Sequence, residues 1–192
     1  MLITVRAVLF FIFPMKIVGR ENVPKTGGIV LCCNHISYMD PVYLSLAVKR
    51  PVFYMAKEEL FNHRFLGWLL KSLGAFPVRR GAGGQSGIHT GEDIIKQGRI
   101  MGIFPEGTRS KDLTPQRAKS GVAMIAAQTG ADVLPAAIAV KGKIRPFRRV
   151  TVRIGKIIPN GELAVKQGLP SEIKAAAGRI MEEIRALWEA GN

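Results

Sequence analysis

The residues best suited to chemistry in this 192-residue chain lie in two short blocks, each directly after an apolar run. The first block reads Asn-His-Ile-Ser-Tyr-Met-Asp-Pro over 34–41 and follows the apolar run 29–33. At a strand end, the His35 imidazole can accept a proton from an attacking hydroxyl, and the Asp40 carboxylate can stabilise the resulting imidazolium. Asp40 before Pro41 is also typical of a helix start, so this spacing alone does not establish catalysis.

The second block reads Phe-Pro-Glu-Gly-Thr-Arg-Ser over 104–110. Its proline and glycine predict a sharp turn, and Gly107 lets a ligand approach the backbone. The Arg109 guanidinium can bind a phosphate through two parallel hydrogen bonds, although a solvated arginine in a turn is the alternative. Two further runs, 74–80 and 133–138, make the pattern specific.

These four blocks, with the stretch 57–60 that leads into Gly67 and Trp68, resemble the 1-acylglycerol-3-phosphate acyltransferases of phospholipid synthesis. The resemblance implies that His35 is the general base acting on the acceptor hydroxyl and that Asp40 orients it. It also implies a substrate-binding site made of Arg80, Glu106, Gly107, Thr108, Arg109 and Lys119. A solvated lysine is the alternative for Lys119, but a cation at a helix start opposes the helix dipole, which favours a bound anion there.

The implied reaction transfers an acyl chain from an acyl thioester to the free sn-2 hydroxyl of 1-acylglycerol 3-phosphate, giving phosphatidic acid. The donor is acyl-CoA or acyl carrier protein, and no cofactor is expected. Three histidines without helical pairing, and two adjacent cysteines, predict no metal site. Backbone N–H groups of the 35–40 turn are candidates to hold the developing oxyanion. A covalent route through Ser37 or Cys33 is less favoured, because the acceptor brings its own hydroxyl.

Other functions remain open at this point. The acceptor could be another lysophospholipid or a lyso-aminolipid, and the chain could instead be a non-catalytic basic module that binds lipid or nucleic acid. Nucleic acid is not an expected partner, because Phe147 is the one aromatic residue in the basic stretch 141–156.

Around these blocks, short apolar runs alternate with longer amphipathic ones, which is typical of an α/β domain. We expect a single domain with a central mixed β-sheet flanked by helices, as in the glycerolphosphate acyltransferases, preceded by a short apolar amino-terminal helix. Strands are expected at 28–33, 52–55, 75–78, 100–104, 133–140 and 150–158, and helices at 41–48, 58–73, 87–97, 120–129 and 171–189. The glycine-rich stretch 81–87 predicts a flexible loop.

The composition fits this organisation. Hydrophobic residues make up 47% and charged residues 22%, which excludes a disordered chain. The formal net charge is +14, which predicts a polyanionic partner such as an anionic membrane surface or a phosphorylated molecule. A run of basic residues without acids favours anionic lipid headgroups over a solvated strand edge: Lys141, Lys143, Arg145, Arg148, Arg149, Arg153 and Lys156.

The amino terminus predicts contact with a membrane rather than a crossing of it. We expect residues 1–15 to form an apolar membrane-interface segment and residues 16–192 to form the acyltransferase domain. The uninterrupted apolar stretch 7–15 is shorter than the roughly 20 residues that span a bilayer, and no cleavage signal is visible. With so short a segment before the family body, the anchor of longer relatives would be reduced here.

The expected location is therefore the cytoplasmic face of the cell membrane, as a peripheral or monotopic protein. A stripe of Phe61, Phe65, Trp68 and Leu69 in the expected 58–73 helix is a second candidate for the interface, although such stripes more often face a core. Adjacent Cys32 and Cys33 cannot readily pair, which predicts buried thiols in a reducing compartment.

Overall fold

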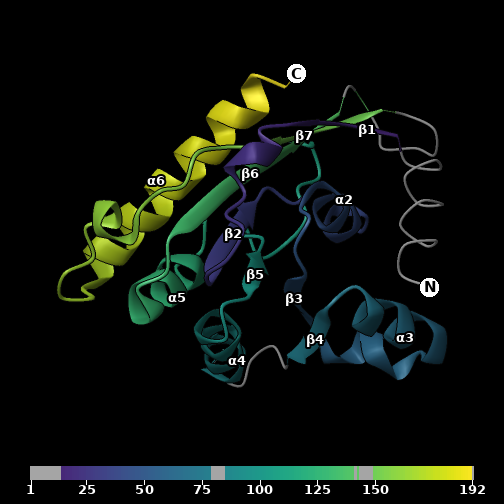
Figure 1. The fold of residues 1–192 in the computed structure, drawn as a ribbon, viewed down its shortest axis with the longest axis horizontal. Helices are drawn as coiled ribbons and strands as arrows, with labels where there is room; N and C mark the ends of the chain where they lie inside the picture. Colours follow the sequence, from purple (N-terminus) through teal and green to yellow (C-terminus); the bar gives the residue numbers. More distant parts are fainter. Residues whose placement is uncertain (1–13, 79–84, 141, 143–148, 192) are drawn as a thin grey trace.

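A computed structural model describes residues 14–78, 85–140, 142 and 149–191. Within these residues, seven strands form one mixed sheet in the order β1-β7-β6-β2-β5-β3-β4 (Figure 1). Neighbours are parallel except β6 and β7, which are antiparallel. The strands are β1 (Met15–Val18), β2 (Ile29–Cys33), β3 (Val52–Lys57), β4 (Ala75–Val78), β5 (Ile100–Ile103), β6 (Val133–Ala139) and β7 (Val150–Ile154). The predicted α/β fold with a mixed sheet is confirmed.

Helices cover both faces of this sheet. The α-helices are α2 (Asp40–Ala47), α3 (Arg64–Ser72), α4 (Gln85–Lys96), α5 (Gly121–Thr129) and α6 (Pro170–Glu189), and the short 3-10 helices are η1 (Arg20–Asn22), η2 (Glu58–Asn62) and η3 (Asn160–Leu163). Figure 1 shows α4, α5 and α6 along one side of the sheet and α2 on the other. No helix in the described part of the chain has the length and apolar character needed to span a bilayer.

The central strands are apolar along their whole length because both of their faces are covered. Every residue of β2 is buried. Val30 and Cys32 pack with residues of α4, α5 and α6, whereas Leu31 and Cys33 pack with residues of α2. Both cysteines are buried free thiols, as predicted. The polar groups that follow β2 and β5 therefore emerge at one sharply defined edge of the sheet.

The predicted helix 58–73 is wrong as a single element. It is divided into η2 and α3 at His63, whose extended backbone (φ −84°, ψ 113°) interrupts the helix. The reason is a tertiary contact: η2 folds back against α3, and a Cβ atom on Gly67 would lie 2.7 Å from the carbonyl oxygen of Phe61. Phe61 therefore does not continue the stripe of α3.

Three further differences from the prediction concern β1, the end of β7 and the start of α4. Strand β1 was not expected and forms by parallel pairing with β7. Strand β7 ends at Ile154, four residues early, and Ile158 instead makes an isolated antiparallel bridge with Val133. The expected loop 81–87 is helical over its last three residues, which begin α4. The expected amino-terminal helix, most of the 141–148 stretch and Arg80 lie outside the described residues.

Candidate active site

The two chemical blocks meet at the carboxyl edge of the sheet. Strands β2 and β5 are parallel neighbours, with Cys32 in register with Ile103, so the loops that follow them leave the sheet side by side. The backbone N–H of Ser110 donates to the carbonyl oxygen of His35 at 2.7 Å. Residues separated by 75 positions in the sequence are thereby joined in one site.

His35 and Asp40 form the centre of the site. The distance between His35 Nδ1 and Asp40 Oδ2 is 2.7 Å. The same oxygen accepts the backbone N–H groups of Ile36 at 2.7 Å and Ser37 at 2.8 Å. Burial raises the pKa of the Asp40 carboxyl above its usual value, and the hydrogen bonds from His35 and the backbone oppose that rise. Asp40 thus holds both the imidazole and the turn that carries it.

The His35 imidazole ring also stacks on an aromatic side chain. The ring of Phe104 stacks on the His35 ring with centroids 4.1 Å apart and an interplanar angle of 19°. The His35 side chain remains 19% exposed. Because Nδ1 is engaged by Asp40, Nε2 is the nitrogen that can accept a proton from a substrate.

Glu106 lies behind His35. It is 2% exposed, and its Oε1 accepts the backbone N–H of His35 at 3.0 Å. Burial raises its pKa to about 7, helped by the negative charges of Asp40 and Asp112 and opposed by the backbone N–H groups of His35 and Gln116. The resemblance implies substrate binding by Glu106, whereas the structure places its carboxylate against the backbone of the base.

Asn34 braces the base from the other side, a role that the sequence prediction missed. Its side chain is fully buried, donates to the Ile138 carbonyl oxygen at 3.0 Å and accepts the Ile138 N–H at 2.8 Å. These two bonds tie the residue before His35 to the backbone of β6. A buried amide at a strand end, directly before a histidine, was the available signal.

Five of the six backbone N–H groups in the turn 35–40 are bonded within the protein. Asp40 accepts two of them, Glu106 a third, and Ser37 two more: the donors are His35, Ile36, Ser37, Met39 and Asp40. These five groups are committed to internal acceptors, which leaves the Tyr38 N–H as the candidate that this turn offers for the expected oxyanion site.

The second block contributes a glycine turn and Arg109, and Lys119 follows nine residues after the block. Gly107 has a left-handed backbone (φ +68°), and a Cβ atom there would lie 2.9 Å from Cδ of Lys119. The Lys119 chain crosses this turn, and its N–H donates to the Pro105 carbonyl oxygen at 2.8 Å. Thr108 is exposed. The structure thus brings Gly107 and Lys119 together, as a shared acceptor site would require.

Arg109 is exposed and lies over the ring of Tyr38, with Cζ 3.4 Å from the ring centroid. Tyr38 is 72% exposed and belongs to the turn between His35 and Asp40. The stacked ring holds the Arg109 side chain against the turn that carries His35. Spacing alone did not predict this contact, because it depends on how the two loops face each other.

A cavity of about 530 Å³ opens beside the His35 ring. Its walls come from β3, β4, β5, α4 and α5, and its apolar lining includes Met55, Val78, Ile88, Ile103, Val122 and Ile125. Gly107 and Lys119 lie on its polar margin. The site therefore joins a base, an apolar chamber and a cationic rim.

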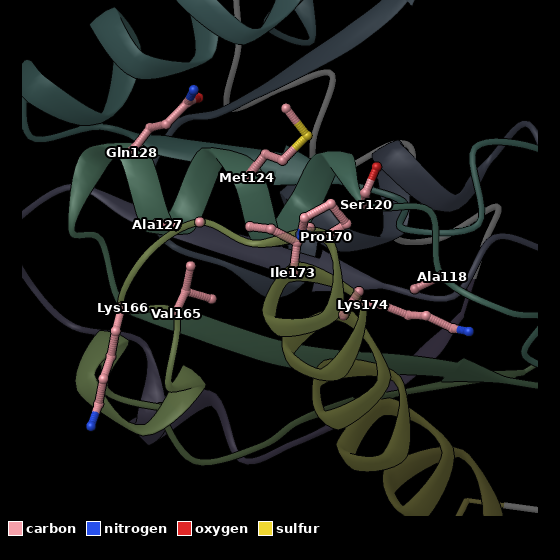
Figure 2. A pocket seen from close by; sticks show the side chains of 12 residues that line it. Ala118, Ser120, Met124, Ala127, Gln128, Val165, Lys166, Pro170, Ile173 and Lys174 are labelled. Atoms are coloured by element: carbon pink, nitrogen blue, oxygen red, sulfur yellow. The ribbon is translucent and has the colours of Figure 1, made fainter.

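A second cavity, of about 630 Å³, lies between α5 and the start of α6. Figure 2 shows Met124 and Ala127 of α5 on one side and Ile173 of α6 on the other. His35 is not among its lining residues, and residues of α5 and of the segment before it line both cavities.

The alternative nucleophiles are poorly placed for covalent chemistry. Cys33 is fully buried, and burial raises the pKa of its thiol well above the usual value. Its Sγ lies 3.5 Å from the Asn34 side-chain oxygen. The Ser37 hydroxyl accepts the Met39 N–H at 3.1 Å. Within the described residues, no group of three His, Cys, Asp or Glu side chains is arranged to hold a metal ion.

Taken together, the fold and the site define an α/β protein with a His–Asp pair beside a largely apolar cavity, in which the aspartate is buried and the histidine is partly exposed. The sequence matches the family described as Acyltransferase over residues 14–139, and the chain therefore belongs to that family. Both chemical blocks fall inside the matched range, so the predicted resemblance is confirmed.

Named relatives agree with this assignment. A 1-acyl-sn-glycerol-3-phosphate acyltransferase of Bacillus subtilis is 39% identical over 124 residues, covering 64% of this chain and 61% of the relative. The Streptococcus pneumoniae protein of that name is 32% identical, covering 89% and 65%. The chain thus spans just under two thirds of the length of these relatives. The crystal structure of the 1-acyl-sn-glycerophosphate acyltransferase from Thermotoga maritima superimposes with a TM-score of 0.67 at 28% identity, covering 95% of this chain and 77% of that one.

Proposed function

We propose that this chain transfers an acyl group from an acyl thioester to the sn-2 hydroxyl of 1-acylglycerol 3-phosphate, giving phosphatidic acid. The observation that carries the proposal is the 2.7 Å pair of His35 and Asp40 at the mouth of an apolar cavity. The names of the relatives support the choice of acceptor. The thioester is acyl-CoA or acyl carrier protein.

In this mechanism, His35 Nε2 removes the proton from the acceptor hydroxyl while that oxygen attacks the thioester carbonyl carbon. The charge of Asp40 stabilises the imidazolium that forms. The tetrahedral intermediate then collapses, the carbon–sulfur bond breaks, and the departing thiolate takes the proton from the imidazolium. The oxygen–carbon bond of the new ester replaces the thioester bond, and His35 returns to its neutral state.

The cationic rim gives this reaction its selectivity for a phosphorylated acceptor. Lys119 lines the cavity and Arg109 lies on Tyr38 in the turn that carries His35, and a guanidinium and an ammonium are suited to a phosphate. The resemblance adds Arg80 to this set. Glu106 Oε1 accepts the backbone N–H of His35 and so helps to hold the base in place.

The apolar cavity suits an acyl chain. Its aliphatic walls begin beside the His35 ring, so a chain inside it would leave its carbonyl group near the base. Burial of a hydrocarbon chain contributes about 0.8 kcal/mol for each methylene, which is enough to select long chains over short ones. Lipid substrates of this kind reside in a bilayer, and we propose that the protein works as a peripheral protein at the cytoplasmic face of the cell membrane.

The test is a product assay with purified protein. Both thioester donors are offered with a panel of lyso-acceptors, and products are identified by mass spectrometry. We expect phosphatidic acid from the wild type, and a loss of at least about a hundredfold in kcat/KM for His35→Ala. His89→Ala is the matched control, because His89 is an exposed residue of α4. Consumption of no thioester with any acceptor, or equal loss in both variants, would contradict the proposal.

A further inference from the structure

Helix α3 exposes two large aromatic side chains next to each other. Phe65 is 76% exposed and Trp68 is 52% exposed, and their ring centroids lie 6.2 Å apart. In the described part of the chain, large hydrophobic residues with such exposure are few, and two of them share this one turn. Aromatic side chains in this state are typical of a surface that is covered during function.

The fold fixes the direction in which this pair points. On another side of α3, Gly67 is buried against η2, where its Cα lies too close to Phe61 to tolerate a side chain. That contact anchors the helix and prevents it from rotating to bury its aromatic residues. Phe65 and Trp68 are therefore held outward by the packing of the helix.

The charged residues of α3 itself are all basic, whereas η2, which packs against α3, carries Glu58 and Glu59. Arg64 and Lys71 are exposed residues of α3, and the helix contains no acidic residue. Lys57, which is also exposed, lines the catalytic cavity. Aromatic rings beside lysine and arginine are typical of proteins that lie in an anionic membrane interface. A symmetric contact with a second copy would place these cations close to their equivalents.

The location links this face to the catalytic cavity. Strand β3 ends at Lys57 on the carboxyl edge of the sheet, and η2 and α3 follow it directly. Met55 and Val78, in the two strands that α3 connects, line the cavity wall. A bilayer that touches α3 would therefore lie beside the chamber proposed to receive the acyl chain.

We propose that the Phe65–Trp68 face of α3 inserts into the interface of an anionic phospholipid bilayer and brings the catalytic cavity to the membrane. This inference rests on the proposed function insofar as the lipid substrates come from that bilayer. The occupant is a lipid surface, to which the aromatic pair supplies apolar contact and Arg64 and Lys71 supply attraction to the headgroups.

The first experiment measures vesicle binding by flotation of the full chain. Vesicles of phosphatidylcholine are compared with vesicles that also contain phosphatidylglycerol. We expect the double variant Phe65→Ser, Trp68→Ser to partition at least about tenfold more weakly than the wild type. The matched control is Leu169→Ser, which removes a 46% exposed apolar residue elsewhere and should bind as the wild type does. Replacement of Arg64 and Lys71 by Gln should weaken the preference for phosphatidylglycerol, and an unchanged preference would exclude these two cations from the contact.

The second experiment observes insertion directly. The chain has two tryptophans, so Trp188→Phe leaves Trp68 as the sole reporter. Addition of anionic vesicles should shift its emission to shorter wavelength, and lipids brominated in the acyl chain should quench it. Unchanged Trp68 emission in protein that floats with vesicles would overturn the inference, as would a dimer in solution that the double variant dissociates.

Failure of this inference differs from failure of the proposed function. Acyl transfer with detergent-dispersed substrates requires no docking, and the double variant should retain wild-type activity there. An inactive wild type whose Trp68 still inserts would refute the proposed function alone. An active enzyme whose Trp68 stays in water would refute the docking face alone.

Discussion

The ionisation of Glu106 can be used to test whether its carboxyl is buried behind His35 as the structure shows. Its carboxyl is almost fully buried behind His35, and burial raises its pKa to about 7 from an ordinary 4.5. The unfolded chain therefore releases this proton at lower pH than the folded chain does. Folding stability from this group is complete below the unfolded pKa and is lost as the pH rises from about 4.5 through about 7.

The perturbation is Glu106→Gln, which keeps an oxygen able to accept the His35 N–H and removes the ionisation. One pKa unit corresponds to about 1.36 kcal/mol, so the wild type should lose about 2–3 kcal/mol through this group between pH 5 and pH 8. The variant should lack this component. Its free energy of unfolding should therefore fall about 2–3 kcal/mol less than that of the wild type over the same interval.

The assay is urea unfolding at several pH values, followed by far-ultraviolet circular dichroism. A constant offset between the two proteins at all pH values cancels, because only the pH dependence is compared. Parallel curves for wild type and variant would refute the reasoning, since they would mean that Glu106 titrates alike in the folded and unfolded chain.

Three further substitutions test other parts of the site. Asp40→Asn keeps an oxygen that can accept the Ile36 and Ser37 N–H groups but removes the charge beside the imidazole. We therefore expect kcat to fall by about 10² to 10⁴ while the circular dichroism spectrum stays unchanged. A kcat within threefold of the wild type would count against general-base catalysis. Tyr38→Ala should raise KM for the phosphorylated acceptor about two- to fivefold because it releases Arg109, whereas Tyr38→Phe keeps the ring and should leave KM unchanged. Equal KM values in the two variants would show that stacking of Arg109 on the ring does not affect acceptor binding. Asn34→Ala leaves both backbone groups of Ile138 unpaired in the core. It should lower the free energy of unfolding, measured in urea, by about 2–4 kcal/mol. A loss below about 1 kcal/mol would contradict the role of Asn34 in holding the end of β2 against β6.

Much of the fold could be predicted because its signals are local. The fully buried strands β2 and β6 are continuous apolar runs, and the helix α6 carries its apolar residues at helical spacing. The failures share one cause, which is contact between distant segments. Strand β1 exists through its pairing with β7, and the break at His63 follows from the packing of η2 on Gly67. Neither contact leaves a trace in the local pattern.

The site divides in the same way. The sequence by itself determined which functional groups follow the strands, since His35, Asp40, Glu106 and Arg109 belong to two compact blocks with recognisable chemistry. Their assignment as base, orienting group and substrate contacts stays a prediction for the experiments above to test.

Only the tertiary structure decided what each group faces. Parallel pairing of β2 with β5 turns Glu106 toward the backbone of His35 and stacks Phe104 on the imidazole, and the facing loops set Arg109 on Tyr38. The burial that raises the Glu106 pKa also arises from this assembly. Residue types and spacing specify the chemistry that a chain can do, whereas desolvation and side-chain direction depend on neighbours that are distant in sequence.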